Sequence, residues 1–157
     1  MTKWTWLIVG AVGLSWSLLL LPWVHVGQQS RTGTELSELL ALLPLLAILM
    51  FLISLYGKAS QVLRIGATTA LGFASFISFT TNFVAAPASV ALQESLSGIA
   101  GEDTLATLGQ AHLLFGASQA LLTMAGLALM LANPPKLARQ RKIDESDSRT
   151  IWEEQSE

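Results

Sequence analysis

The sequence predicts an all-α membrane protein, a bundle of four transmembrane helices with both termini in the cytoplasm. Its 157 residues are 52% apolar and only 13% charged, against about 25% charged residues in an ordinary soluble domain. The apolar residues gather into four runs of nearly membrane-spanning length, and the basic residues gather on one side of these runs. Together these observations favour a multi-pass plasma-membrane protein.

The four expected spans cover residues 4–24, 37–57, 63–86 and 111–132, and each contains a long charge-free run, with Glu38 and Arg64 near the starts of the second and third spans. The first run, Trp4 to Val24, measures about 31 Å as a helix at roughly 1.5 Å per residue, close to the ~30 Å of a hydrocarbon core. Its apolar residues are continuous and lack a period of two, which disfavours strands. A cleaved signal peptide is the alternative, but the run exceeds an h-region of about 7–15 residues and no A-x-A site follows.

Local signals mark the second span. The stretch TGTE, Thr32 to Glu35, has the T-x-x-E spacing of a capping box, so a helix is expected to begin there. Glu35 and Glu38 then suit the positive end of that helix. Pro44 falls inside the helix and removes one backbone donor, which predicts a bend.

Basic residues set the expected orientation. Lys3 precedes the first span, and Lys58 and Arg64 lie between the second and third. Five more follow the fourth span, at Lys136, Arg139, Arg141, Lys142 and Arg149. By the positive-inside rule this side is cytoplasmic, which leaves Arg31 and a loop at residues 87–110 outside. Residues 1–133 therefore form the expected transmembrane domain, and residues 134–157 form a polar tail with the composition of a flexible segment.

A group of polar and aromatic residues is expected at the outer ends of the spans. Trp23, His25, Asn82 and His112 fall at this level, and Gln119 lies about two turns into the fourth span. Gathered by antiparallel spans, they would supply the aromatic face and the few directional polar groups of a small-molecule site. The alternatives are an interface anchor for Trp23, a solvated imidazole for His25, and a helix-to-helix hydrogen bond for Gln119.

Small residues recur every four positions in the third span, at Gly66, Ala70, Ala74 and Ser78. Such a stripe lets another helix backbone approach closely, so these residues are expected at a helix–helix interface. The partner stays open: another span, a second copy of the chain, or another protein.

Catalytic and cofactor chemistry is not expected. Cysteine is absent and there are only two histidines, which removes thiolate sites and leaves a weak metal signal. No ionisable residue lies in the middle of a span, which disfavours an autonomous ion-driven pump. No nucleophile–base pair, carboxylate pair or phosphate-binding loop is visible. The chain is therefore expected to be no enzyme, to hold no cofactor or metal, and to bind no nucleic acid.

Several motifs resemble the tryptophan-operon-associated membrane proteins of actinobacteria. They are PWVHV at the end of the first span, TGTELSELLALLPLLA at the start of the second, and TIWEEQ around Trp152 in the tail. The resemblance covers nearly the whole chain. It implies a link to tryptophan, such as uptake across the plasma membrane, and it carries over no catalytic residue.

Two functions follow from the sequence. The first is a small non-enzymatic membrane protein that binds an aromatic amino acid, tryptophan above all, or assists its uptake. The second is an accessory or scaffolding subunit of a larger plasma-membrane complex, favoured by the small-residue stripe and the small soluble portion. The expected partners are the lipid bilayer and either another membrane protein or a second copy of the chain.

Overall fold

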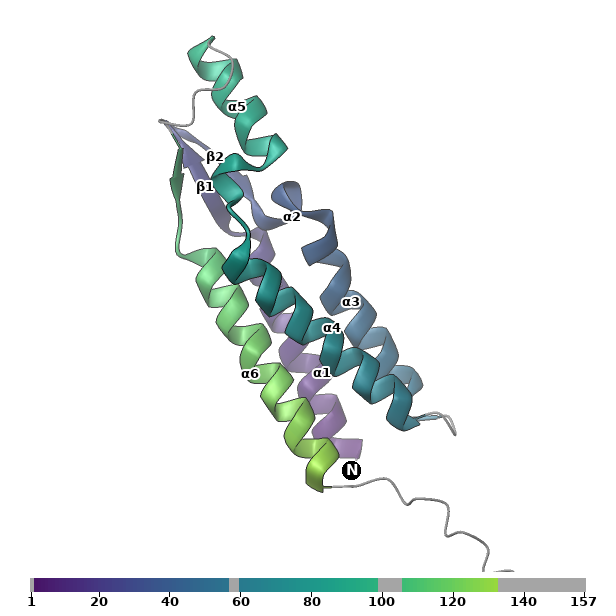
Figure 1. The fold of residues 1–157 in the computed structure, drawn as a ribbon. Coiled ribbons are helices and arrows are strands. Elements are labelled where there is room, and N and C mark those ends of the chain that lie inside the picture. The colour runs from purple at the N-terminus through teal and green to yellow at the C-terminus, as the bar shows by residue number, and fades with distance from the viewer. Residues whose placement is uncertain (1, 57–59, 99–105, 133–157) are drawn as a thin grey trace, which may run out of the picture.

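Four long helices run side by side in alternating directions (Figure 1). The computed structural model describes residues 2–56, 60–98 and 106–132, so the expected tail at 134–157 lies outside the described residues. The bundle helices are α1 (Thr2–Trp16), α3 (Glu38–Ile53), α4 (Ser60–Thr80) and α6 (Ala111–Ala132). The expected all-α class is confirmed for the bulk of the described chain, which is helical.

A second unit, here called the head, covers one end of the bundle (Figure 1). It contains the strands β1 (Pro22–Val26), β2 (Gln29–Thr32) and β3 (Ala106–Leu108), and the short helices α2 (Gly33–Leu36), η2 (Phe83–Ala85) and α5 (Pro87–Ser97). The strands form an antiparallel sheet in the order β2-β1-β3, with Val24 opposite both Arg31 and Leu108. Gly27 turns the chain between β1 and β2 with a φ of 59°, a left-handed conformation that glycine adopts freely.

The first helix is shorter than expected, and the sheet was not expected at all. After α1, a 3-10 turn, η1 (Ser17–Leu20), leads to Leu21, which is extended with a ψ of 156°. Pro22 explains this end, because proline lacks a donor and pushes the preceding residue out of the helical region. The PWVHV stretch, placed in a span ending at residue 24, is instead β1.

The third span and the outer loop also differ from their expected bounds. The span was expected to reach residue 86, but α4 ends at Thr80 and η2 follows as a separate turn. The region expected as a loop, residues 87–110, contains α5 and β3. The fourth helix has the expected bounds, Ala111–Ala132.

The expected cap at TGTE is present, but it starts only one helical turn. Glu35 Oε2 accepts the backbone N–H of Thr32 at 3.0 Å, and α2 ends at Leu36, because the next residue, Ser37, is extended with a φ of −154°. The Ser37 hydroxyl then accepts the N–H of Leu40 at 3.4 Å and begins α3. The expected second span thus begins as two helices, each with its own cap: Thr32 and Glu35 at α2, and Ser37 at α3.

Pro44 lies inside α3 without ending it. The indole Nε1 of Trp16 donates to the carbonyl oxygen of Ala41 at 3.1 Å, one turn before the proline. A neighbouring helix therefore supplies a donor in the region where proline disturbs the backbone hydrogen bonds, as buried prolines in apolar helices require.

α4 lies between α3 and α6 and packs against both. Of the small-residue stripe, Ala70, Ala74 and Ser78 are buried. Gly66 lies against α3, where a β-carbon would meet Met50 Sδ at 3.1 Å. Ser78 lies against α6 and donates its hydroxyl to the carbonyl of His112 at 2.6 Å. Within the described residues the stripe thus contacts other helices of the same chain.

Glycines of α6 complete this contact, and sequence inspection did not single them out. A β-carbon on Gly116 would lie 3.0 Å from Phe79 Cζ, and one on Gly126 would lie 2.7 Å from Thr68 Oγ1. The Ser75 hydroxyl donates to the carbonyl of Gly116 at 2.9 Å. α4 and α6 therefore approach closely because one contributes small hydroxyl residues and the other glycines.

The outer surface of the bundle is apolar. Leucines, phenylalanines and other large apolar side chains of all four helices are exposed, among them Leu14, Val62 and Leu121 at 76%, 72% and 68%. Within the described residues, three helices are long and apolar enough to cross a membrane: Lys3–Leu20, Ser60–Thr80 and Ala111–Ala132. α3 is also apolar but shorter, with 16 residues.

We expect Gly126→Ala to destabilise the protein. The added methyl group must displace Thr68, which typically costs about 1–3 kcal/mol, while the gain in helix propensity returns only about 1 kcal/mol. Gly13→Ala is the matched control, because nothing lies within 4 Å of its β-carbon position. Thermal unfolding in mild detergent, followed by circular dichroism, measures both. A Gly126→Ala protein as stable as Gly13→Ala would contradict the close approach of α4 and α6.

Candidate functional site

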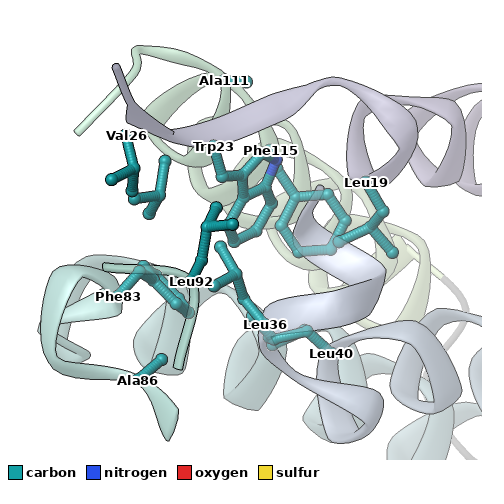
Figure 2. Packing of buried hydrophobic residues seen from close by; sticks show 12 residues of the cluster. Leu19, Trp23, Val26, Leu36, Leu40, Phe83, Ala86, Leu92, Ala111 and Phe115 are labelled. Atoms are coloured by element: carbon teal, nitrogen blue, oxygen red, sulfur yellow. The ribbon is translucent and has the colours of Figure 1, made fainter. Parts of the chain in front are cut away.

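Trp23 lies at the centre of the head and is completely buried. Its ring packs edge-on against Phe83 with centroids 5.0 Å apart, and against Phe115 at 5.6 Å (Figure 2). Its Nε1 donates to the carbonyl of Leu18 at 3.0 Å. The indole is therefore enclosed and its single donor is satisfied.

The remaining surface of the indole is covered by α2 and α5. A β-carbon on Gly33 would lie 2.6 Å from Trp23 Cε2, so only glycine fits at this position. Leu36 of α2 and Leu92 of α5 belong to the same buried cluster and point into it (Figure 2). The aromatic face expected to receive a ligand is thus occupied by side chains of the chain itself.

His112 lies next to Trp23 and has a structural hydrogen bond. The two ring centroids are 6.2 Å apart, and His112 is 8% exposed at the start of α6. Its Nδ1 lies 2.6 Å from the carbonyl oxygen of Gly109. Because a carbonyl only accepts, Nδ1 carries the proton. The Gly109 N–H in turn donates to the carbonyl of Trp23 at 2.7 Å, which joins β1 to the turn before α6.

His25 points away from this cluster. It is exposed in β1, directly opposite Ser30 of β2 and Thr107 of β3. Ser30 and Thr107 are exposed as well. We call these three residues the polar row. Val24 and Val26 of the same strand are buried, so the sheet has one packed face and one exposed polar face.

Asn82 and Gln119 lie apart from the other candidates. Asn82 is exposed, and its Oδ1 accepts the N–H of Val84 at 3.2 Å, which caps η2. Gln119 is fully buried inside the bundle, where its Nε2 donates to Ser15 Oγ at 2.8 Å and links α6 to α1. Of the five candidate residues, the structure therefore brings only Trp23 and His112 together.

Two buried polar residues of α5 were missed by sequence inspection. Ser89 and Gln93 are fully buried. Gln93 Nε2 donates to the carbonyl of Val84 at 3.4 Å, while Ser89 Oγ and Gln93 Oε1 have no hydrogen-bond partner among the described residues. Their spacing of four within one helix was the available signal, but the region lacked the apolar periodicity that would have predicted a helix.

No metal centre is formed by the part of the chain that the structure describes, where no three histidine, aspartate or glutamate side chains gather. Comparisons with protein-family models, with curated proteins and with solved structures find no match to this chain. Functional inference therefore rests on the geometry of the head and of the bundle.

We expect Trp23→Ala to destabilise the protein strongly, because truncating a buried aromatic residue typically costs about 3–5 kcal/mol. Trp23→Phe keeps an apolar ring and should cost less, losing mainly volume and the bond to Leu18. The control is Trp4→Ala, since Trp4 is 62% exposed on α1 and surface changes usually stay within about 0.5 kcal/mol. Circular dichroism melts in detergent measure all three. Equal melting temperatures for the two alanine variants would contradict the central role of Trp23.

Proposed function

We propose that the chain is a non-enzymatic four-span protein of the plasma membrane, with both termini in the cytoplasm, that serves as an accessory or scaffolding subunit of a larger membrane complex. The membrane location is supported by the apolar outer surface of the bundle and by three helices of spanning length. α3 is the proposed fourth span. The sheet then lies outside the hydrocarbon layer, because open sheet edges do not occur there.

The proposed orientation is supported by charges at the two ends of the molecule. Lys3 and Arg64 lie near the ends of α1 and α4 that are remote from the head, whereas Arg31 belongs to the head (Figure 1). The positive-inside rule assigns the remote end to the cytoplasm. The head then faces the outside.

The accessory role is supported by the division of the head into a closed interior and an exposed polar row. Trp23 and His112, the strongest candidates for ligand contact, are packed inside. A ligand at that place would have to displace the indole from Phe83 and Phe115. The polar row of His25, Ser30 and Thr107 instead lies open on a hydrogen-bonded sheet. A fixed polar surface of this kind suits contact with another protein better than enclosure of a small molecule.

A tryptophan-linked role is the second candidate, and the unsatisfied polar atoms of α5 favour it. Ser89 Oγ and Gln93 Oε1 are buried and have no hydrogen-bond partner in the part of the chain that the structure describes, and they belong to the helix whose Leu92 packs into the aromatic cluster. An aromatic amino acid combines a ring suited to that cluster with an ammonium donor suited to these atoms. Binding would require α5 to move away from Trp23.

We expect the head to be outside and the tail inside the cell. The chain contains no cysteine, so single cysteines report position cleanly. Gln28→Cys lies in the exposed turn between β1 and β2, and Ser146→Cys lies in the tail. An impermeant thiol reagent should label Gln28→Cys on intact cells and Ser146→Cys only after permeabilisation. The reverse pattern would contradict the proposed orientation.

The accessory role is tested by purifying the full chain from its native membranes in mild detergent and identifying the chains that co-migrate. We expect a partner in fixed stoichiometry, and we expect His25→Ala and Thr107→Ala to reduce it several-fold without lowering the melting temperature. Val62→Ala is the matched control, because Val62 is exposed at the start of α4, the end of that helix remote from the head.

Tryptophan uptake, measured in parallel at equal membrane abundance, separates the two candidates. Loss of uptake in Gln93→Met with the partner retained would favour the tryptophan-linked role. A chain that migrates alone, with uptake unchanged in every variant, would contradict both.

A further inference from the structure

A cavity of about 330 Å³ lies among the helix ends remote from the head. Its lining includes Trp4 and Thr5 of α1, Phe51 of α3 and Leu129 of α6, and the single charged residue in the lining is Arg64 of α4. A volume of this size lies in the range of small-molecule sites, about 300–1,000 Å³. The cavity is distinct from the head and from every candidate residue discussed above.

Arg64 enters this cavity without a carboxylate partner among the described residues, where the one ion pair joins Arg31 to Glu35. Its Nε donates to Ser54 Oγ at 3.4 Å, and the Ser54 hydroxyl donates to the carbonyl of Phe51 at 2.6 Å. These hydrogen bonds hold the Arg64 side chain between the end of α3 and the start of α4. The terminal nitrogens remain as donors with the planar geometry that suits a phosphate or carboxylate.

A second hollow adjoins the first along α1 and α6. It has a volume of about 560 Å³ and is lined only by apolar residues and Trp4, which include Leu7, Ala11, Leu122 and Ala128. Trp4, Leu129 and Ala132 line both hollows. We call this second hollow the α1–α6 groove. The cationic cavity and the apolar groove are therefore adjacent, with these three residues in the walls of both.

The length of the groove matches one leaflet of a bilayer. From Leu122 to Ala132 it follows eleven residues of α6, a rise of about 15 Å at roughly 1.5 Å for each of the ten steps between them. Half of a hydrocarbon core of ~30 Å has the same depth. At the proposed membrane location the groove would run from the helix ends to about the middle of the bilayer, and Arg64 in the adjacent cavity would lie near the level of lipid phosphates.

We propose that these two adjacent hollows together bind one anionic phospholipid, with its phosphate at Arg64 and an acyl chain in the α1–α6 groove. The inference rests on the proposed membrane location and is independent of the accessory or tryptophan-linked role. The occupant follows from the combination of features, because an apolar groove of leaflet depth beside a guanidinium that has no carboxylate partner among the described residues matches the polarity and the charge of a phospholipid. Trp4, which lines both parts, lies at the interface where indole rings prefer to be.

The test is native mass spectrometry of the full chain released from lipid nanodiscs containing phosphatidylglycerol and phosphatidylcholine. We expect one phosphatidylglycerol retained per wild-type chain, in preference to phosphatidylcholine. Arg64→Gln should lower this retention about fivefold, the factor that corresponds to about 1 kcal/mol for one basic side chain near anionic lipid. Arg64→Lys should keep most of it, since the charge remains.

A matched pair of variants tests the groove. Ala128→Phe places a ring in the α1–α6 groove and should abolish lipid retention, because Ala128 lines it. Ala117→Phe makes the same change at another exposed position of α6 outside the groove and should leave retention unchanged. Both changes lie on the exposed surface of the bundle, so the pair stays informative if the Arg64→Gln protein fails to fold.

Three outcomes would overturn the proposal. The first is equal retention of phosphatidylglycerol by wild type and Arg64→Gln, and the second is equal retention by Ala128→Phe and Ala117→Phe. The third is a wild-type chain that retains no lipid but gains it in Glu153→Gln/Glu154→Gln, which would assign Arg64 to the acidic tail of the chain itself. None of these outcomes bears on partner co-purification or tryptophan uptake, so the lipid site and the proposed function are tested separately.

Discussion

Enclosure of the Trp23 indole is the interaction on which the head depends. The ring is held by the Leu18 carbonyl of η1, by Phe83 of η2 and by Phe115 of α6. The Trp23 carbonyl accepts the Gly109 N–H, which brings the end of the third strand against the first. Gly33 must lack a side chain to let α2 pass over the ring. One residue thus contributes to the position of η1, α2, η2, β3 and the start of α6.

The bundle could be predicted from the sequence, and the sheet could not. Long charge-free runs leave few alternatives to helices, and the bounds of α6 and the capping residues Thr32 and Glu35 follow from local signals. The strand at PWVHV is different, because a short apolar run with valines is compatible with helix or strand. The strand conformation is determined by the pairing of Val24 with Leu108, two residues that are far apart in the sequence. No local pattern encodes that contact.

For the candidate site, the sequence predicted how far along the bundle each residue lies, but not which side chains meet. Trp23 and His25 are two residues apart and would share a face in a regular strand. The register of β1 and β2 shifts between Pro22 and Val24. Trp23 therefore lies on the packed face of the sheet, whereas His25 lies on the exposed face. Such an irregularity depends on the packing of the neighbouring rings. The same holds for Gln119, whose bond to Ser15 depends on how α1 and α6 meet.

The shortness of α3 has a consequence for the surrounding membrane. Its 16 residues measure about 24 Å, whereas the 21 residues of α4 measure about 32 Å, at roughly 1.5 Å per residue. With α3 as the proposed fourth span in a bilayer with a ~30 Å core, this side of the bundle would have hydrophobic mismatch, which is relieved by local thinning or by association with another helix. At the proposed location the α3 side would therefore favour thin bilayers and form the flank along which lipid packing is least favourable.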